Sequence, residues 1–525
     1  MALAVHVIGA GAGLPPGGAN AVGGKAWNLA RLADAGLPVP PAFVLPTSWC
    51  RALRDGTADD AAVAAALDEG IARLEAATGL GFGSARRPLL VSVRSGAAVS
   101  MPGMLETVLD VGLNAAAVEG LLRLTGNPRL AWDCWRRLVQ GYAEVVQGLP
   151  GAFDDMVAAA LAQGEVESER DLDHRVLRGL ALAMLERFRG LAGRPFPSDP
   201  RAQLLAAALA VFRSWDAPKA ATYRRLNGLD DDAGTAVTVQ AMVFGNAGGN
   251  SGAGVGFTRD PATGVRGLYV DFVFNGQGED VVAGRRATDG GARLQRMLPG
   301  VYGQLEAMCH TLEGLFGDAQ DFEFTLQSGV LWLLQTRRAK RTPWAALRIA
   351  VDLVEEGLLS PAEARHLLDG VDLATVVRTR FADPGPVLAR AQVAGVGVAS
   401  GRIALDSAAA ARLAVTGPVI LVRQETVTED IAGLASAAGI LTATGGRTSH
   451  AAVVARQLGR VCLVACPALA IDLVRRTCRI GGQAFAEGDP ISLDGNEGSV
   501  HAGMQAVVAE SPARELAAIA RWKDA

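Results

Sequence analysis

The spacing of apolar residues predicts mostly helices in the first half of the chain. Residues 60–78 and 201–226 repeat apolar positions with the helical period, so each range predicts a helix. Residues 114–195 have the same spacing and are rich in Ala, Leu and Arg, which favours a helical insertion within a domain. Residues 88–94 form a short apolar run that ends at an arginine, and such a run indicates a buried strand.

Strand patterns follow these helices. Residues 235–243 and 268–273 are predicted strands, and glycines crowd the segment 245–256 between them. Residues 321–326 and 330–337 predict a hairpin that turns at Gln327-Ser328-Gly329. This α+β region is a candidate nucleotide site.

A second domain is predicted after a shift to Pro, Val and Gly at residues 386–400. Short strands and short helices alternate beyond this point. We therefore expect a multidomain protein of mixed α+β and α/β class. The expected divisions are residues 1–340, with a helical insertion at about 114–200, a helical linker at 341–388, a second domain at 389–508 and a helical tail at 509–525.

Composition excludes some classes of function. The chain has 525 residues and a formal net charge of −4, so it has no electrostatic footprint for nucleic acid or an anionic membrane. No apolar run approaches the ~18 residues of a spanning helix. The cysteines have no CxxC spacing, and Cys462 and Cys466 are expected to be buried thiols. A cytoplasmic protein fits these properties.

The predicted hairpin brings together groups that suit a metal and a phosphate. Asp321 and Glu323 are two positions apart on one strand and therefore face the same way. Gln335 and Arg337 repeat that spacing, and we expect a regular hairpin to place all four on one face. Carboxylate and amide oxygens suit Mg²⁺, and a guanidinium suits phosphate. An ordinary cross-strand ion pair is the alternative.

Two other cations occupy positions that favour an anion. Lys25, one of only four lysines, follows Gly23-Gly24 at a predicted helix start, where backbone N–H groups and the helix dipole favour phosphate. A solvent-facing lysine is the alternative. Arg94 ends the buried strand, where a phosphate contact and a structural ion pair are both open. The Gly245–Gly256 loop matches no Walker A motif and joins two strands, so it is a weak signal.

His450 has the most distinctive setting of the six histidines. Gly445-Gly446 allows a tight turn, and Thr448-Ser449 can cap a helix over Ala451–Arg456, which places His450 near a helix N-terminus. An imidazole at a helix start is a competent nucleophile, and a phosphoryl group on its nitrogen would be stabilised by the dipole and nearby arginines. We therefore expect His450 to be a phosphorylated histidine.

The motifs resemble those of a known family. The run Thr444–Arg456 is similar to the phosphohistidine signature that pyruvate phosphate dikinase shares with phosphoenolpyruvate synthase and enzyme I of the phosphotransferase system. The N-terminal half is similar to the dikinase in particular. The motifs concerned are Val91–Gly96, Ser100–Met104, Val211–Trp215, Gly254–Pro261 and Gln277–Gly284, with Glu425–Ile431 upstream of the histidine.

The resemblance implies an N-terminal ATP-grasp domain and a swivelling phosphohistidine domain. The pyrophosphoryl group of ATP would pass to His450 with release of AMP, and inorganic phosphate would then take the outer phosphoryl group and leave as pyrophosphate. Arg94 and Arg337 would take part in catalysis, and Glu323 and Gln335 would hold Mg²⁺. Thr448 matches a threonine that some relatives have phosphorylated. The implied ATP-binding residues are Lys25, Arg94, Gln240, Met242, Glu279, Asp321, Glu323, Gln335 and Arg337.

Two departures from the family pattern affect the expected partners. Arg447 stands where the dikinase usually has methionine, and only about twenty residues follow the second domain, whereas a phosphoenolpyruvate/pyruvate barrel needs ~250. We therefore expect pyruvate to be bound by a separate protein. The open alternatives are a different small-molecule or protein acceptor, a non-catalytic nucleotide-binding regulator, and a chain cut from a longer dikinase. A homodimer is compatible with the resemblance.

Overall fold

The protein is a mixed α/β chain that divides into two compact units. Unit 1 comprises residues 1–252, 274–276 and 323–337, and unit 2 comprises 253–273, 277–322 and 338–525. The structure is a computed structural model, and it describes residues 3–99, 101, 106–166, 168–278, 290–426, 430–445 and 450–522.

Unit 1 combines a central antiparallel sheet with many helices. Its elements are β1 (His6–Ile8), α1 (Gly18–Asp34), β2 (Ala42–Leu45), α2 (Thr47–Arg54), α3 (Asp60–Thr78), β3 (Gly81–Phe82), β4 (Pro88–Leu89), β5 (Val91–Gly96), β6 (Thr107–Val111), α4 (Ala115–Thr125), α5 (Pro128–Gln147), α6 (Asp154–Gly164), the short η1 (Glu169–Asp171), α7 (His174–Ala192), α8 (Pro200–Ser214), α9 (Pro218–Leu226), β7 (Ala236–Ala241) and most of the hairpin β10 (Gln320–Gln327) and β11 (Val330–Arg338).

The five-stranded sheet has the order β1-β2-β7-β5-β6 and two faces of different chemistry. The register pairs Arg94 with Thr238 and Ser92 with Gln240, and paired residues point to the same face. These polar side chains therefore share one face. The alternate residues of the same strands, including Val93 and Val239, belong to a large buried apolar cluster on the other face.

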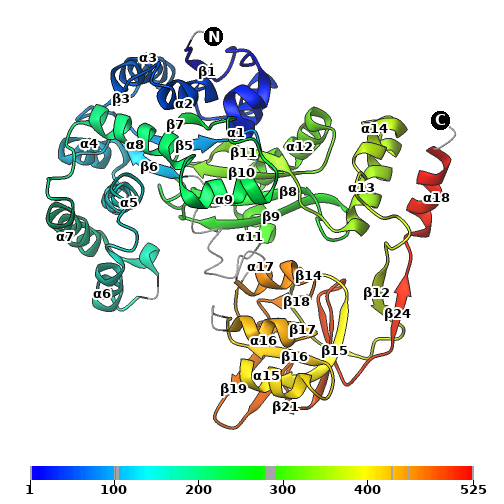
Figure 1. Cartoon of the computed structure of the whole chain (residues 1–525). Coiled ribbons are helices and arrows are strands. Elements are labelled where there is room, and N and C mark those ends of the chain that lie inside the picture. The colour runs from blue at the N-terminus through cyan, green and yellow to red at the C-terminus, as the bar shows by residue number, and fades with distance from the viewer. Residues whose placement is uncertain are drawn as a thin grey trace. The chain divides into compact units, whose positions relative to one another are not determined.

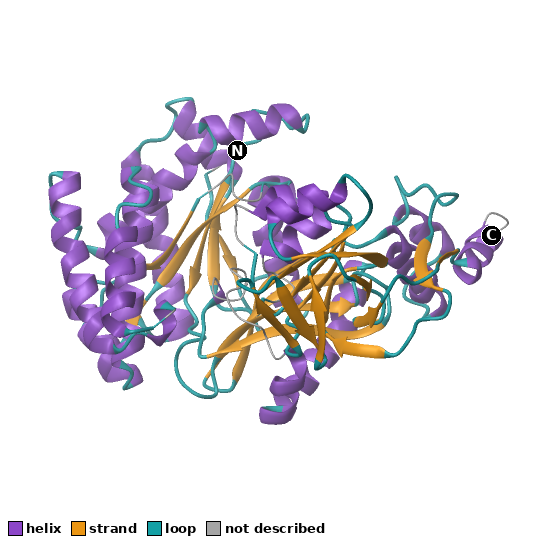
Figure 2. Ribbon diagram, turned by 90° about the horizontal axis from the view of Figure 1, so that it is seen from below, coloured by secondary structure: helices purple, strands orange, loops and turns teal. Residues whose placement is uncertain are grey.

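Helices cover the apolar face of this sheet. α3 packs on β2, α5 on β6 and α8 on β5, and α7 lies against α5 in the helical layer (Figures 1 and 2). Caps define these helices, because Asn127 accepts a hydrogen bond from Leu130 N at the start of α5 and Gly148 ends it in the left-handed conformation. The helical pattern over 114–195 thus corresponds to α4, α5, α6 and α7.

One predicted helix is two. The expected single helix over 201–226 breaks after α8, and α9 begins at Pro218. Proline has no N–H and its ring clashes with the preceding turn, so it opens a helix readily and interrupts one. The predicted helix over 60–78 agrees with α3, residue for residue.

α1 is interrupted where it meets the end of β5. It begins at Gly18, earlier than expected, but Gly23 has φ 79° and ψ 152°, which no residue with a Cβ adopts readily. A Cβ at Gly23 would lie 2.5 Å from both the carbonyl carbon and oxygen of Gly96. Gly24 N also donates to Ala97 O at 2.9 Å. The glycine pair therefore permits a backbone-to-backbone contact that places Lys25 beside β5.

A second contact joins α1 to the hairpin. Asn28 Nδ2 donates to Thr336 O at 2.9 Å, and Leu333 N donates to Pro38 O at 2.7 Å. Lys25 and Asn28 are three residues apart on the helix and so lie on the same side of it. Because Arg337 follows Thr336 directly, the bond at Asn28 brings Arg337 close to Lys25.

Unit 2 contains the remaining elements. They are β8 (Gly252–Arg259), β9 (Arg266–Phe274), α11 (Gly290–Met297), α12 (Pro299–Phe316), α13 (Pro343–Glu355), α14 (Pro361–His366), β12 (Arg378–Phe381), β13 (Val387–Arg390), β14 (Gln392–Gly395), β15 (Val398–Ala404), α15 (Ser407–Ala414), β16 (Val419–Arg423), α16 (Ile431–Ser436), β17 (Gly439–Thr442), α17 (His450–Gln457), β18 (Val461–Val464), β19 (Leu469–Asp472), β20 (Thr477–Ile480), β21 (Gln483–Ala486), β22 (Pro490–Asp494), β23 (Ser499–Ala502), β24 (Val507–Glu510) and α18 (Ala513–Arg521).

An eight-stranded sheet forms the core of the C-terminal part of unit 2. Its order is β13-β23-β22-β15-β16-β17-β18-β14. The strands from β15 to β18 are parallel to one another, and α15, α16 and α17 connect them in turn. A four-stranded sheet, β11-β10-β8-β9, contains the predicted hairpin.

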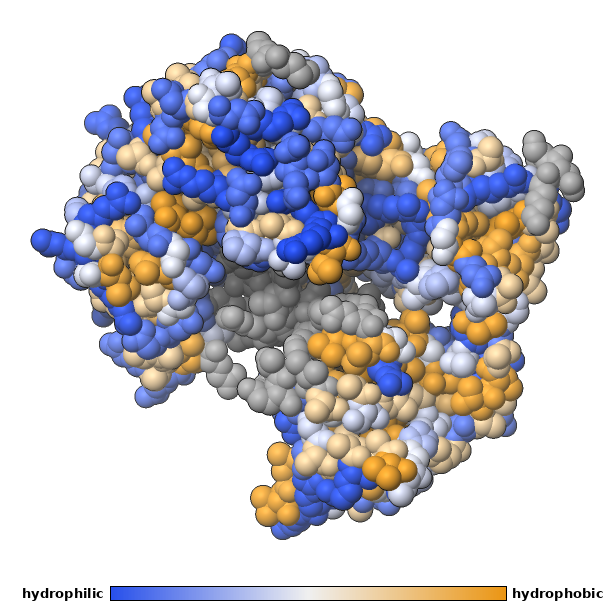
Figure 3. Space-filling model, in the orientation of Figure 1, coloured by the Kyte–Doolittle hydropathy of each residue, from blue (hydrophilic) through white to orange (hydrophobic). Residues whose placement is uncertain are grey.

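The visible surface of the protein mixes hydrophilic and apolar residues (Figure 3). Hydrophilic residues cover most of the helical layer in this view, and apolar residues are scattered among them (Figure 3). Within the described ranges, no helix has the length and apolar character needed to cross a bilayer.

We predict that Gly23→Ala destabilises unit 1 by about 3 kcal/mol or more, because the new methyl group would meet the Gly96 backbone and the backbone angles are unsuited to alanine. Thermal unfolding measures the effect. Gly36→Ala is the matched control, since Gly36 also has a positive φ of 75° but has open space around its Cβ position, and it should cost only about 1 kcal/mol. Equal midpoints for the two variants would contradict the role of the close contact.

Candidate functional site

Four of the predicted nucleotide-site residues lie within electrostatic range of one another in unit 1. Desolvation by surrounding protein lowers the pKa of the Lys25 ammonium, Arg94 and Arg337 lower it further, and Glu323 raises it. The Lys25 side chain is nevertheless exposed. A cation that is surrounded by protein and still reached by solvent is available to a ligand. We call Lys25, Arg94, Glu323 and Arg337 the cationic cluster.

The polar face of the five-stranded sheet supplies one side of this cluster. Arg94 comes from β5, and Gln240 from β7 is on the same face because its partner Ser92 is two residues before Arg94. α1 packs over β5 and β7 and contributes Lys25. The cluster therefore stands where an anion would meet three cations from separate elements and one carboxylate.

Gln240 on β7 and Met242 just after it, which are also predicted nucleotide contacts, are less accessible to solvent than Lys25. Gln240 is 1% exposed, and its Nε2 donates to Pro40 O at 3.3 Å. Met242 packs partly buried against the apolar cluster, and its backbone N donates to Leu90 O at 2.9 Å. Both residues line the course of β7, and their contact with a nucleotide stays a prediction.

The hairpin is present, with a two-residue turn at Ser328 and Gly329, both at positive φ. A regular ladder from this turn pairs Gln327 with Val330 and hence sets Glu323 opposite Leu334 rather than Gln335. The shared face expected for Glu323 and Gln335 therefore requires a bulge in β11. Asp321 is buried, and because it lies two residues before Glu323 on β10, the two side chains point to the same face of the sheet.

The donor set nevertheless suits Mg²⁺. Magnesium bound with a nucleotide uses one or two carboxylates together with phosphate oxygens, and Asp321 and Glu323 provide two carboxylates on one strand face. Among the residues that the structure describes, no group of three or more His, Cys, Asp or Glu side chains gathers as a metal site. The phosphates of ATP would have to complete the coordination.

Several predicted residues cannot be placed. Glu279, Arg447 and Thr448 lie outside the described residues, and so do Thr428 and Glu429 of the upstream motif. His450 is the first residue of α17, one position before the start of the predicted helix over Ala451–Arg456, although its side chain is not described. A histidine at the first position of this eight-residue helix faces the positive end of the helix dipole.

The two motifs around His450 meet at the carboxyl ends of β16 and β17. Thr444 donates to Gln424 O from both its backbone N, at 3.0 Å, and its Oγ1, at 2.9 Å. Ala443 N donates to Arg423 O at 3.1 Å. In sheets with parallel strands, ligands bind at these carboxyl ends. The segment that leads to His450 is thus fixed to its neighbour before the helix begins.

Small residues let α17 lie close to the sheet. Ala451, Ala452 and Ala455 are buried and pack in one cluster with Ile440 and Cys462. This is the reason for the alanine-rich run after His450, since larger side chains would lift the helix from the strands.

Some motif residues prove to be structural. Arg259 of the Gly254–Pro261 motif is fully buried, and its guanidinium donates to both Glu313 carboxylate oxygens and to Glu356, each at 2.8 Å. His501, which lies outside the motifs, is also structural, because it is buried between Ser499 Oγ and Gly385 O. Sequence patterns do not separate such buried partners from ligand contacts, because both require polar groups at fixed positions.

Two residues that sequence analysis did not select help to build the site. Asn28 attaches α1 to β11, and Gly96 receives the backbone of Gly23. The Gly23-Gly24 pair signalled that a close approach was required, but only the fold identifies the partner strand.

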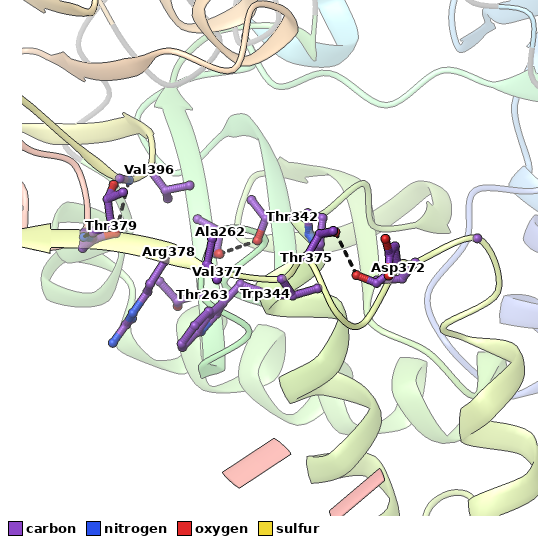
Figure 4. A pocket seen from close by; sticks show the side chains of 16 residues that line it. Ala262, Thr263, Thr342, Trp344, Asp372, Thr375, Val377, Arg378, Thr379 and Val396 are labelled. Carbon is purple, nitrogen blue, oxygen red and sulfur yellow. Dashed lines mark hydrogen bonds between the residues drawn. The ribbon is translucent and has the colours of Figure 1, made fainter. Parts of the chain in front are cut away.

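Unit 2 also contains a cavity of about 430 Å³ that holds none of the predicted site residues (Figure 4). Arg378 lies over the Trp344 ring with its guanidinium carbon 4.4 Å from the ring centre. Thr342 Oγ1 donates to Ala262 O, and Thr375 Oγ1 donates to Asp372 O. These hydroxyls of the wall are therefore engaged by the chain itself.

All six cysteines are buried, which confirms the expectation of buried thiols at Cys462 and Cys466. Burial raises the pKa of Cys309 to about 12 and that of Cys478 to about 11, because a thiolate is poorly solvated in the interior.

Two family models match the chain. Residues 58–297 match the model described as pyruvate phosphate dikinase, AMP/ATP-binding domain, and residues 415–498 match that described as PEP-utilising enzyme, mobile domain. The first match includes Arg94 and Gln240, and the second includes His450. The hairpin and Lys25 lie outside both matches.

Comparisons with whole relatives extend the similarity to the hairpin and to Lys25. The pyruvate, phosphate dikinase of Clostridium symbiosum is 43% identical over 92% of this chain and 56% of its own length. That of Rhizobium meliloti is 40% identical over 98% of the chain and 60% of its own length, and a chloroplastic enzyme of Zea mays is 40% identical over 96% and 54%. The chain thus spans somewhat more than half the length of these relatives. With both domain models in the expected order and such identity over nearly all its residues, the chain belongs to the pyruvate phosphate dikinase family.

Proposed function

We propose that the chain uses ATP and Mg²⁺ to phosphorylate His450, as the first half of a pyruvate phosphate dikinase reaction. The cationic cluster of Lys25, Arg94 and Arg337 with Glu323 is the observation that most supports this proposal. Unit 1 would then act as an ATP-grasp nucleotide domain, and the eight-stranded sheet with α17 as the core of a swivelling phosphohistidine domain.

The cluster suits the triphosphate of ATP. Lys25, Arg94 and Arg337 would bind and orient phosphate oxygens, since a guanidinium donates two parallel hydrogen bonds and an ammonium acts as a compact charge. Burial lowers the pKa of Lys25, repulsion from Arg94 and Arg337 lowers it further, and a bound anion would relieve that repulsion. Gln240 and Met242 would lie along the nucleotide.

Magnesium would be held by Glu323, Gln335 and phosphate oxygens, with Asp321 and Glu279 nearby. When bound, the ion withdraws charge from the phosphates. Glu323 also raises the pKa of Lys25, against the lowering by burial and by the two arginines, and so favours the charged ammonium that would contact phosphate.

The chemistry at His450 has two steps. A ring nitrogen of His450 attacks the β-phosphorus of ATP, the bond from that phosphorus to the α-phosphate oxygen breaks, and AMP leaves. An oxygen of inorganic phosphate then attacks the outer phosphorus, and pyrophosphate leaves while one phosphoryl group stays on His450. The start of α17 would stabilise the added charge.

The final acceptor in this proposal is pyruvate, bound by a domain outside these residues or by another protein. This follows the names of the relatives, all of which are longer than the chain. Phosphorylation of Thr448, two positions before His450, would add negative charge beside the phosphoryl group and oppose its transfer.

The central prediction concerns labelled ATP. Label in the β-phosphate should become attached to His450 in an acid-labile form and remain after inorganic phosphate is added, whereas label in the γ-phosphate should leave as pyrophosphate. His450→Ala should reduce the attached label to background. Mass spectrometry locates the label, and chromatography measures AMP and pyrophosphate.

His366→Ala is the matched control, because the His366 side chain is 81% exposed and lies outside both sites. It should take up label like the parent protein. Labelling of His450→Ala at the parental level would sink the proposal.

The magnesium site is tested with Glu323→Gln. Losing this carboxylate should raise the Mg²⁺ concentration for half-maximal labelling at least about tenfold, because the ion loses a charged ligand. Glu119→Gln removes an exposed carboxylate paired with Arg123 and should leave the Mg²⁺ dependence unchanged. If the two variants share one Mg²⁺ dependence, Glu323 is not a ligand.

A further inference from the structure

A buried hydroxyl lies beside the cationic cluster with no hydrogen bond. Thr238 is 2% exposed, and its Oγ1 finds no partner within the part of the chain that the structure describes. A buried polar group without a partner costs about 1–3 kcal/mol, so proteins seldom keep one that serves no state of the molecule.

The register of the sheet specifies what this hydroxyl faces. Thr238 is paired with Arg94 across β5 and β7, and with Val44 across β7 and β2. Thr238 therefore points to the polar face, under α1 and directly beside Arg94 of the cationic cluster. The neighbouring positions Val237 and Val239 point to the apolar core instead.

The chemistry of the pair is complementary. The Arg94 guanidinium has five N–H donors and no acceptor, while a threonine hydroxyl can accept two hydrogen bonds. Cross-strand neighbours have Cβ atoms about 5 Å apart, which is within the reach of an arginine side chain that changes rotamer.

We infer that Thr238 is a positioning residue for Arg94: its hydroxyl accepts an N–H from the guanidinium when Arg94 binds the phosphates of ATP. This inference rests on the proposed nucleotide site. In the nucleotide-free protein the hydroxyl is unsatisfied, and in the loaded protein its hydrogen bond fixes the direction of the guanidinium. Part of the affinity for ATP thus derives from a group that does not touch the nucleotide.

The isosteric variant Thr238→Val tests the inference, because it should lose affinity for ATP without losing thermal stability. Removing an unsatisfied hydroxyl should leave the thermal midpoint unchanged or raise it, whereas a hydroxyl that supports the fold would lower the midpoint on removal. The affinity for ATP should fall about tenfold, as expected for loss of a hydrogen bond to a charged donor. Thr238→Ser should restore most of that affinity.

Thr235→Val is the matched structural control. The Thr235 hydroxyl is also buried, but it donates to Ala236 O and accepts from Gly96 N, each at 3.2 Å. This variant should therefore have a lower thermal midpoint, in contrast to Thr238→Val. A lower midpoint for Thr238→Val as well would show that its hydroxyl is structural and would overturn the inference.

Titration calorimetry of the full chain with the α,β-methylene analogue of ATP measures binding without transfer, because the bond that breaks is replaced. Adenosine is the control ligand without phosphates. The affinity of Thr238→Val for adenosine should stay within about twofold of the affinity of the parent protein. The parent, Arg94→Lys, Thr238→Val and the double variant form a cycle in which the Thr238 effect should disappear once Arg94 is replaced.

The outcomes are distinguishable. A parent protein that binds no ATP analogue overturns the proposed function together with this inference. A parent that binds, with Thr238→Val binding equally well, overturns the inference alone. An equal loss from Thr238→Val in the presence and absence of Arg94 shows that Thr238 acts directly on the nucleotide, which also overturns the positioning role.

Discussion

The proposed nucleotide site depends on one close contact between two stretches of backbone. Gly23 touches Gly96, and this contact allows the helix that contains Lys25 to approach the strand that contains Arg94. Asn28 attaches the other side of the helix to β11 beside Arg337. These two contacts bring together the elements that contain three cations, and the repulsion among those cations would be relieved by a bound anion.

The second site is built by a different principle. At the start of α17, alternation of parallel strands and helices brings two motif loops to one sheet edge, and the bonds from Thr444 to Gln424 join them. Strand order and the small residues of α17 position the start of the helix against the sheet. The first site is thus defined by charged side chains from separate elements, whereas the second is defined by where α17 starts at the edge of the sheet.

The sequence predicted the elements better than their partners. α3 and the hairpin followed from periodicity and turn residues, and the break before Pro218 was missed although the proline was visible. Local spacing indicated that Lys25, Arg94 and Arg337 suit phosphate and that Glu323 suits Mg²⁺. Only strand register shows that Arg94 and Thr238 share a face. Parity along one strand says nothing about the neighbouring strand, and for this reason the expected alignment of Gln335 with Glu323 does not follow from a two-residue turn.

The burial of every cysteine has a practical consequence for following this protein in motion. Since all six thiols are enclosed, a thiol-reactive probe has no accessible native target in the folded state. A single cysteine introduced on an exposed helix would accordingly take a spectroscopic label without removal of the natural ones. Pairs of such labels, one in each unit, would report distances between the units during a reaction cycle, and slow reaction of the native thiols would serve as an internal clock for unfolding.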